Sequence, residues 1–120
     1  MQPKVLVVDD DRHIVGLLTQ LFRDEGFEVR AATDGLIALD YIDRGEADVV
    51  VSDVMMPRLN GIELARMLQG RPVRVPLVLI SAIPRQRDMP DVPFIRKPFD
   101  LDYLLRVVNE LLDREADVIN

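Results

Sequence analysis

The sequence VVVSDVMMPRLNG, residues 49–61, decides the fold of this 120-residue chain. Three consecutive valines without polar alternation are typical of a strand that is buried on both faces, as in a parallel sheet. The apolar run ends abruptly on the carboxylate of Asp53, and Pro57 and Gly61 indicate a loop before the next helix. The pattern therefore predicts that Asp53 is a reactive group at the tip of a buried strand.

Segments with strand and helix patterns alternate on both sides of this stretch. The expected strands are residues 5–8, 27–32, 49–51, 77–80 and 94–96, and the expected helices are about 12–25, 36–44, 62–69 and 101–114. Strands that alternate with helices predict the α/β class, as a doubly wound five-stranded parallel sheet with right-handed crossovers and helices on both faces.

One connection in this pattern is expected to lack its helix. Between Ser81 and Phe94, three prolines at 84, 90 and 93 leave only residues 85–89 uninterrupted. A helix of fewer than about 10 residues is marginal, so we expect a loop with at most one turn and a fourth helix that is shortened or missing. Residues 1–120 are predicted to form a single domain, with residues 115–120 as a fraying tail or the start of a linker.

Composition excludes several classes of protein. The formal charge of -6 at pH 7, from 21 acidic and 15 basic residues, argues against nucleic-acid binding by this segment. No cysteine is present, so disulfides and cysteine metal sites are excluded, and a reducing cytoplasmic location is expected. No apolar run is long enough for a signal sequence or a membrane span.

Polar residues follow several of the expected strands. They are Asp9 and Asp10, Asp53, Ser81 and Lys97. In an open α/β sheet, the carboxyl ends of the strands converge on a crevice where the strand order reverses. Carboxylates a few ångströms apart repel one another by roughly 4 kcal/mol per pair at an effective dielectric of about 20, so a cation is expected among them.

The chemistry of these residue types suits phosphate. Carboxylates without histidine or cysteine ligands favour Mg²⁺, which keeps several waters and shares them with phosphate oxygens. The ammonium of Lys97 and the hydroxyl of Ser81 can stabilise a phosphoryl group. Asp53 would then be the nucleophile and form an aspartyl phosphate.

Four short motifs carry a resemblance to a known family. They are Val-Val-Asp9-Asp10, Asp53-Val-Met-Met-Pro57 with Gly61, Ile80-Ser81-Ala82, and Lys97-Pro98-Phe99. Together they span nearly the whole chain, and in this order the chain closely resembles the receiver domain of two-component response regulators. The resemblance implies a flavodoxin-like sheet of order 2-1-3-4-5. It also implies that Asp53 takes a phosphoryl group from a sensor histidine kinase or a phosphotransfer protein.

The resemblance implies a cation site as well. Asp10 and Asp53 would bind Mg²⁺, or Mn²⁺, together with the backbone carbonyl of Met55. Asp9 would orient a metal-bound water. The peptide bond before Pro98 would be cis.

Further residues are implied to hold the phosphoryl group and to switch the domain. Ser81 and Lys97 would contact the phosphoryl group. Ser81 and an aromatic residue on the last strand would form the switch, and this position is Phe94 rather than the usual tyrosine. The proline-rich residues 82–93 depart from the family, whose fourth helix commonly belongs to the output or dimer surface.

Three functions remain open from the sequence. The first is a phosphoacceptor switch, not a turnover enzyme, that signals to a downstream effector protein or a fused output domain. The second is a phosphohydrolase with an aspartyl-phosphate intermediate, but Met55 stands where its second carboxylate is expected. The third is a receiver-like protein-binding domain that no longer uses phosphorylation, and the four retained residues Asp10, Asp53, Ser81 and Lys97 argue against it.

Overall fold

Five parallel strands form one sheet in the order β2-β1-β3-β4-β5. The computed structural model describes residues 2–119, with side chains through residue 114. The strands are β1 (Lys4–Val8), β2 (Glu28–Ala32), β3 (Val49–Asp53), β4 (Leu77–Ser81) and β5 (Phe94–Arg96). This order is the one that the resemblance implied, and it makes the fold doubly wound and flavodoxin-like.

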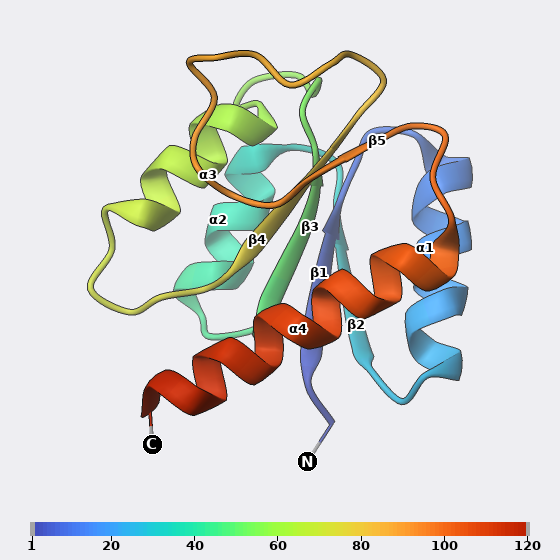
Figure 1. Cartoon of the computed structure of the whole chain (residues 1–120), viewed down its shortest axis with the longest axis vertical. Helices are drawn as coiled ribbons and strands as arrows, with labels where there is room; N and C mark the ends of the chain where they lie inside the picture. The colour runs from blue at the N-terminus through green and yellow to red at the C-terminus, as the bar shows by residue number, and fades with distance from the viewer. Residues whose placement is uncertain (1, 120) are drawn as a thin grey trace.

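Helices cover both faces of this sheet (Figure 1). They are α1 (Arg12–Asp24), α2 (Gly35–Asp43), α3 (Gly61–Gln69) and α4 (Leu101–Ile119). Helices α1 and α4 pack on one face, around Phe22, Leu18 and Leu104, while α2 and α3 pack on the other, around Leu6 and Leu64. The valines of β1 and β3 are fully buried because both faces of these central strands are covered.

Each helix begins at a residue that can accept hydrogen bonds from the free backbone N–H groups of the first turn. Asp11 accepts from the first turn of α1, and Asp34 does the same for α2. Asn60 and Glu63 form a capping box at α3, and Asp100 accepts from the N–H of Asp102 in α4. These side chains fix where each helix leaves the carboxyl end of the sheet.

The connection between β4 and β5 contains no helix, as predicted. Residues 82–93 form a loop with one short turn, which crosses the upper part of Figure 1. Arg85 holds the loop together, since its guanidinium donates to the carbonyl of Pro90 at 2.8 Å and to that of Val92 at 3.1 Å. The side chain of Met89 is buried beneath it. The three prolines thus replace a crossover helix with an ordered loop.

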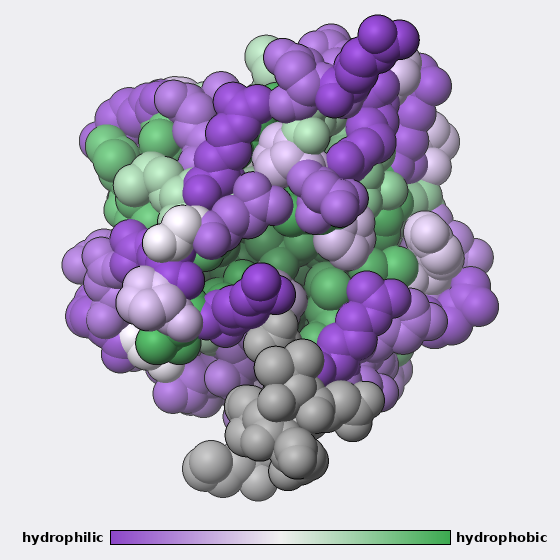
Figure 2. Space-filling view, turned by 60° about the vertical axis from the view of Figure 1, so that its left-hand side comes forward, coloured by the Kyte–Doolittle hydropathy of each residue, from purple (hydrophilic) through white to green (hydrophobic). Residues whose placement is uncertain are grey.

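A hollow of about 570 Å³ lies between α3 and α4, at the amino end of β4. Figure 2 shows an apolar floor between hydrophilic rims on this side of the molecule. Pairing between β4 and β5 starts only at Leu79, so Leu77 and Val78 have no strand beside them on that edge. The hollow is separate from the carboxyl edge of the sheet, where the acidic residues lie.

The last helix is longer than the sequence pattern indicates. Residues 115–120 were expected to form a fraying tail or the start of a linker, and α4 runs to Ile119, so residues 115–119 are helical. Ala116 favours helix, and no glycine or proline interrupts the stretch after Leu112. Within the described residues, no helix is both long enough and apolar enough to cross a membrane.

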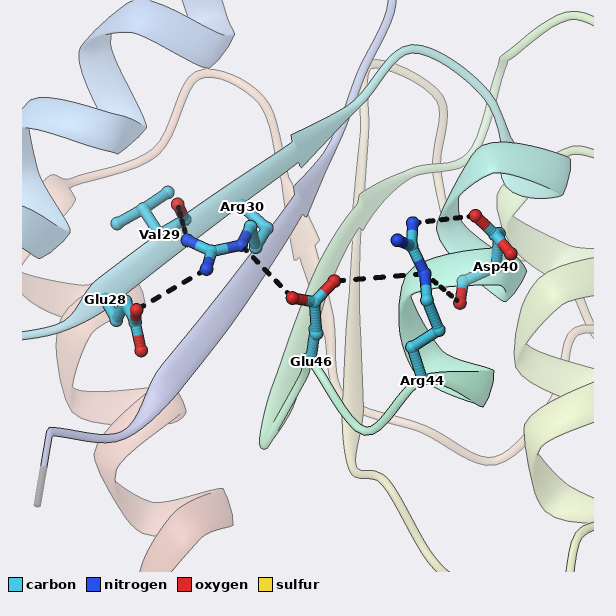
Figure 3. A network of polar contacts seen from close by, with 6 residues as sticks. All are labelled: Glu28, Val29, Arg30, Asp40, Arg44 and Glu46. Carbon is cyan, nitrogen blue, oxygen red and sulfur yellow. Dashed lines mark hydrogen bonds and ion pairs between the residues drawn. The ribbon is translucent and has the colours of Figure 1, made fainter.

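A network of ion pairs lies at the opposite edge of the sheet from the acidic residues (Figure 3). Arg30 contacts Glu28 and Glu46 at 3.5 and 3.9 Å, and Arg44 contacts Glu46 and Asp40 at 4.0 and 2.7 Å. The network joins β2 to α2 and to the turn before β3. Because these side chains are partly exposed to solvent, each pair contributes less than about 1 kcal/mol, and we assign the network a structural role only.

Candidate functional site

The acidic residues come together because β1 and β3 are neighbours in the sheet. Val8 at the end of β1 lies opposite Ser52, so the next residues, Asp9 and Asp53, leave the two strands at the same level. Strand β2 lies on one side of β1 and β3 lies on the other, so the strand order reverses between β1 and β3. Open α/β sheets bind ligands at such points.

Asp9, Asp10 and Asp53 form an acidic cluster. Each offers a carboxylate oxygen, and these three oxygens lie within 4.8 Å of one another. The side chain of Asp9 is 3% exposed and that of Asp53 is 12% exposed, while Asp10 faces solvent. One oxygen of Asp9 accepts from the backbone N–H of Asp11 at 2.9 Å. The cluster is thus open on the side of Asp10.

The protonation of this cluster is perturbed. Burial is the main reason why the pKa of Asp53 is raised above its ordinary value, although Lys97 and the backbone N–H groups of Met55 and Val54 oppose the rise. Burial also raises the pKa of Asp9, against the hydrogen bond from Asp11, and the negative charge of Asp53 adds to the rise. Folding therefore brings together carboxylates that favour a cation or a proton.

Lys97 supplies one positive charge to the cluster. Its Nζ lies 3.7 Å from Oδ1 of Asp53 and 3.8 Å from Oδ2 of Asp9. The backbone N–H of Lys97 donates to the carbonyl of Ser81 at 2.8 Å, which continues the pairing of β4 and β5 and sets the direction of the side chain. The Lys97–Pro98 peptide bond is cis, as the resemblance implied.

Ser81 ends β4, one residue after the pairing partner of Asp53, whereas Phe94 begins β5 opposite Leu79, two residues further from the carboxyl edge of the sheet. Ser81 is fully buried at the end of β4, and its Oγ accepts from the backbone N–H of Ile83 at 3.0 Å. Phe94 is half-buried at the start of β5, and the guanidinium carbon of Arg85 lies 5.9 Å from the centre of its ring. Because Oγ of Ser81 acts as the acceptor in its bond with Ile83, the hydroxyl proton of Ser81 can still be donated to another acceptor.

The loop of residues 54–60 carries Met55, two residues after Asp53. The N–H of Val54 donates to the carbonyl of Ile80, and the carbonyl of Val54 accepts from the N–H of Gly61, both at 3.0 Å. The side chain of Met55 is 65% exposed, so packing of this side chain does not hold the residue in place. The backbone of Met55 is held instead by the hydrogen bonds of the preceding residue, Val54.

Two residues that hold this loop, Arg58 within it and Asp34 outside it, were not recognised from the sequence. The guanidinium of Arg58 pairs with the carboxylate of Asp34, whose side chain is 3% exposed. This contact, together with the N–H of Ile37, holds the pKa of Asp34 below its usual range. The sequence around Asp34 could indicate a helix cap, but not the partner of this carboxylate.

Comparison with known proteins shows the family. The pattern of the response regulator receiver domain matches residues 5–109. This chain belongs to the response regulator receiver domain family. Response regulator MprA of Mycobacterium tuberculosis strain H37Rv is 37% identical over 120 residues, which cover 95% of this chain and 52% of that protein. MprA of Mycobacterium sp. strain KMS is 37% identical over 122 residues, which cover 97% and 53%.

Solved structures agree with this assignment. The receiver domain of Francisella response regulator 1452 superposes with a TM-score of 0.85 at 35% identity and covers 95% of this chain and 99% of that one. The chemotaxis response regulator CheY4 of Vibrio cholerae gives a TM-score of 0.81 at 26% identity, with 92% and 99% covered. The chain is therefore a response regulator receiver domain. It spans about half the length of the curated MprA relatives that it matches.

Proposed function

We propose that this receiver domain accepts a phosphoryl group on Asp53 and changes conformation in response. One observation carries the proposal. The carboxylate oxygens of Asp9, Asp10 and Asp53 lie within 4.8 Å of one another, and Nζ of Lys97 lies 3.7 Å from Asp53, at the switch point of the sheet. A nucleophilic carboxylate beside a fixed ammonium and a divalent-cation site can react with a phosphoryl donor.

The residues present fit Mg²⁺ or Mn²⁺. The cluster offers only carboxylate oxygens, which these hard cations prefer. Burial raises the pKa of Asp9 and of Asp53, and Lys97 does not offset this effect, so a bound cation would help to keep both carboxylates ionised. Asp10, Asp53 and the backbone carbonyl of Met55 would hold the ion, and Asp9 would orient a water bound to it. When bound, the cation neutralises charge on the carboxylates and on the phosphoryl oxygens.

The reaction itself needs only these groups and a donor. A carboxylate oxygen of Asp53 forms a bond to phosphorus, while the bond from phosphorus to the donor's histidine nitrogen breaks and its electron pair leaves with the imidazole. Lys97 stabilises negative charge on the phosphoryl oxygens. The Ser81 hydroxyl, which keeps its proton, then donates to one of these oxygens. Phe94, on the neighbouring strand, repacks as Ser81 moves.

The partners follow from the same chemistry. We propose a sensor histidine kinase or a phosphotransfer protein as the donor, and an effector protein or a fused output domain as the recipient of the signal. The domain would act as a switch and not as a turnover enzyme, with residues 1–120 as one unit. The cytoplasmic location expected from the lack of cysteine stays a prediction.

Acetyl phosphate provides a direct test of phosphorylation. With Mg²⁺, the purified domain is expected to gain the mass of one phosphoryl group, and peptide mapping should place the label on Asp53. Chelation of the cation should prevent labelling. A protein that gains no label would support a binding domain without phosphorylation, and repeated turnover of phosphate esters would support a phosphohydrolase.

Lys97→Ala is expected to slow labelling by acetyl phosphate about 10²- to 10³-fold, because the only ammonium within 4 Å of Asp53 among the described residues is lost. The same change should tighten Mg²⁺ binding, since Lys97 competes with the ion for the carboxylates. Rates of labelling and calorimetric Mg²⁺ titration would measure both effects. Arg96→Ala, an exposed neighbour on β5, is the control and should change neither. Equal labelling rates in wild type and Lys97→Ala would contradict the role of Lys97.

A further inference from the structure

The loop between β3 and α3 is held at two points, and both bear on the position of Met55. At its ends, Val54 is hydrogen-bonded to Ile80 and to Gly61. At its tip, the carbonyl of Leu59 accepts from the N–H of Gly35 at 3.0 Å, the first residue of α2. The tip is thus fixed to a different helix from the one that the loop enters.

An ion pair strengthens the second point. Oδ2 of Asp34 contacts Arg58, while Oδ1 accepts from the N–H groups of Leu36 and Ile37 at 2.8 and 3.0 Å. Oδ1 of Asp34 therefore caps α2, while Oδ2 binds the loop through Arg58. Because Asp34 is buried and immobilised by the cap, it is a rigid partner for Arg58.

The backbone of Arg58 shows that its conformation is imposed by these surroundings. Its φ is 64°, which is the left-handed region and costs a residue other than glycine about 1 kcal/mol or more. Such a conformation persists only where neighbouring contacts determine it. Pro57 has a fixed φ, and Met56 is restricted because it precedes a proline. Only Met55 to Pro57 separate the two fixed points.

We propose that Asp34 and Arg58 are positioning residues, which fix the β3–α3 loop so that the Met55 carbonyl faces the acidic cluster and completes the cation site. Neither side chain belongs to that cluster. The inference rests on the proposed function, because it concerns the affinity of the domain for Mg²⁺. Changes in groups that orient metal ligands cost about 10- to 100-fold in affinity, and an effect through the backbone should lie near the lower limit.

Arg58→Gly separates positioning from stability. Glycine adopts a positive φ without strain, so the loss of a half-exposed ion pair should be offset and the melting temperature should stay close to that of the wild type. The Kd for Mg²⁺, measured by calorimetry on the unphosphorylated protein, should nevertheless rise about tenfold. Asp34→Asn should act similarly, since asparagine caps α2 equally well but loses the charge. Arg58→Lys should restore part of the affinity.

Kinetics add a second readout. With acetyl phosphate, the Mg²⁺ concentration for half-maximal labelling should rise about tenfold in Arg58→Gly, while the rate at saturating Mg²⁺ stays unchanged. Arg71→Ala is the matched control, because Arg71 pairs with Asp43 and also joins α2 to the end of α3, but far from the loop. It should leave the Kd unchanged.

The outcomes separate the inference from the function. If the wild type binds Mg²⁺, Asp10→Asn does not, and both Arg58→Gly and Asp34→Asn keep the Kd of the wild type, the positioning role is wrong while the phosphoacceptor function stands. An equal loss of affinity in Arg71→Ala would also overturn the positioning role, because it would indicate a general loosening of the fold. If the wild type itself neither binds Mg²⁺ nor becomes labelled, the proposed function fails as well.

Discussion

Asp53→Asn is expected to abolish labelling by acetyl phosphate and, without Mg²⁺, to make the domain more stable than the wild type. The first effect follows because the amide is no nucleophile toward phosphorus. The second follows because the carboxylate of Asp53 is mostly buried beside Asp9 and Asp10, and one ammonium group does not compensate for three carboxylates. A reactive group would thus lower the stability of the fold that holds it.

The pH dependence of this gain has a definite sign. Burial raises the pKa of Asp53 in the folded protein above the value of 3.8 for an unperturbed aspartate. Between these two pKa values the folded protein keeps a proton that the unfolded chain has released, so the free energy of unfolding of the wild type falls as the pH rises. Asp53→Asn lacks this titration. The free energy of unfolding of Asp53→Asn should begin to exceed that of the wild type above pH 3.8. The difference should grow until the pH passes the raised pKa of Asp53 in the folded protein, and it should then stay constant.

Thermal unfolding with a chelator present would measure this effect, with a melting temperature a few degrees higher in Asp53→Asn at neutral pH. Glu110→Gln is the control, because it removes one exposed negative charge of α4 and tests whether any reduction of the charge of -6 is sufficient. Mg²⁺ should stabilise the wild type and reduce the difference. A variant less stable than the wild type under chelation would show that the acidic cluster is not under electrostatic strain.

Most of the fold could be predicted because its central strands leave little choice. Residues 5–8 and 49–51 are apolar without alternation, and both strands end on aspartates, so burial on two faces and convergence at one edge follow from the pattern. The loop of residues 82–93 followed from its prolines. The end of α4 did not, because no glycine or proline terminates the helix where the apolar stripe stops.

The contacts around the site were less predictable because they depend on side chains that are distant in the sequence. Asp34 and Arg58 are 24 residues apart, and an arginine at positive φ has no sequence signal. The hydrogen bond from Ile83 to Ser81 also depends on how the loop after β4 turns, which composition does not specify. Propensity and periodicity located the carboxylates, whereas tertiary contacts decide how firmly their surroundings are held.

Gly61→Ala is expected to destabilise the domain by about 3 kcal/mol or more, which is a large part of the 5–15 kcal/mol that is typical of a small domain. A Cβ at this position would overlap the backbone carbonyl oxygen of Asp53 and lie 3.1 Å from Cδ2 of Leu79. The overlapping atom belongs to the backbone and cannot rotate away. Either the end of β3 or the start of α3 has to move.

Neither movement is easy. Asp53 is paired with Ile80 in β4, and α3 is anchored by Leu64, which is fully buried. If the end of β3 yields, the Asp53 carboxylate moves relative to Asp10 and Lys97, so labelling by acetyl phosphate should slow in the variant that remains folded. The glycine is thus required by the close approach of the helix to the strand and not by its own φ.

Gly16→Ala provides the opposite expectation on the same chain. Gly16 lies inside α1, and a Cβ there would meet no atom within 4 Å, so alanine should stabilise the domain by about 0.5–1 kcal/mol through its higher helix propensity. Urea unfolding followed by circular dichroism would compare both variants with the wild type. Equal stability of Gly61→Ala and the wild type would mean that α3 can withdraw from β3 at little cost, and the reactive aspartate would then be held much less rigidly than its contacts indicate.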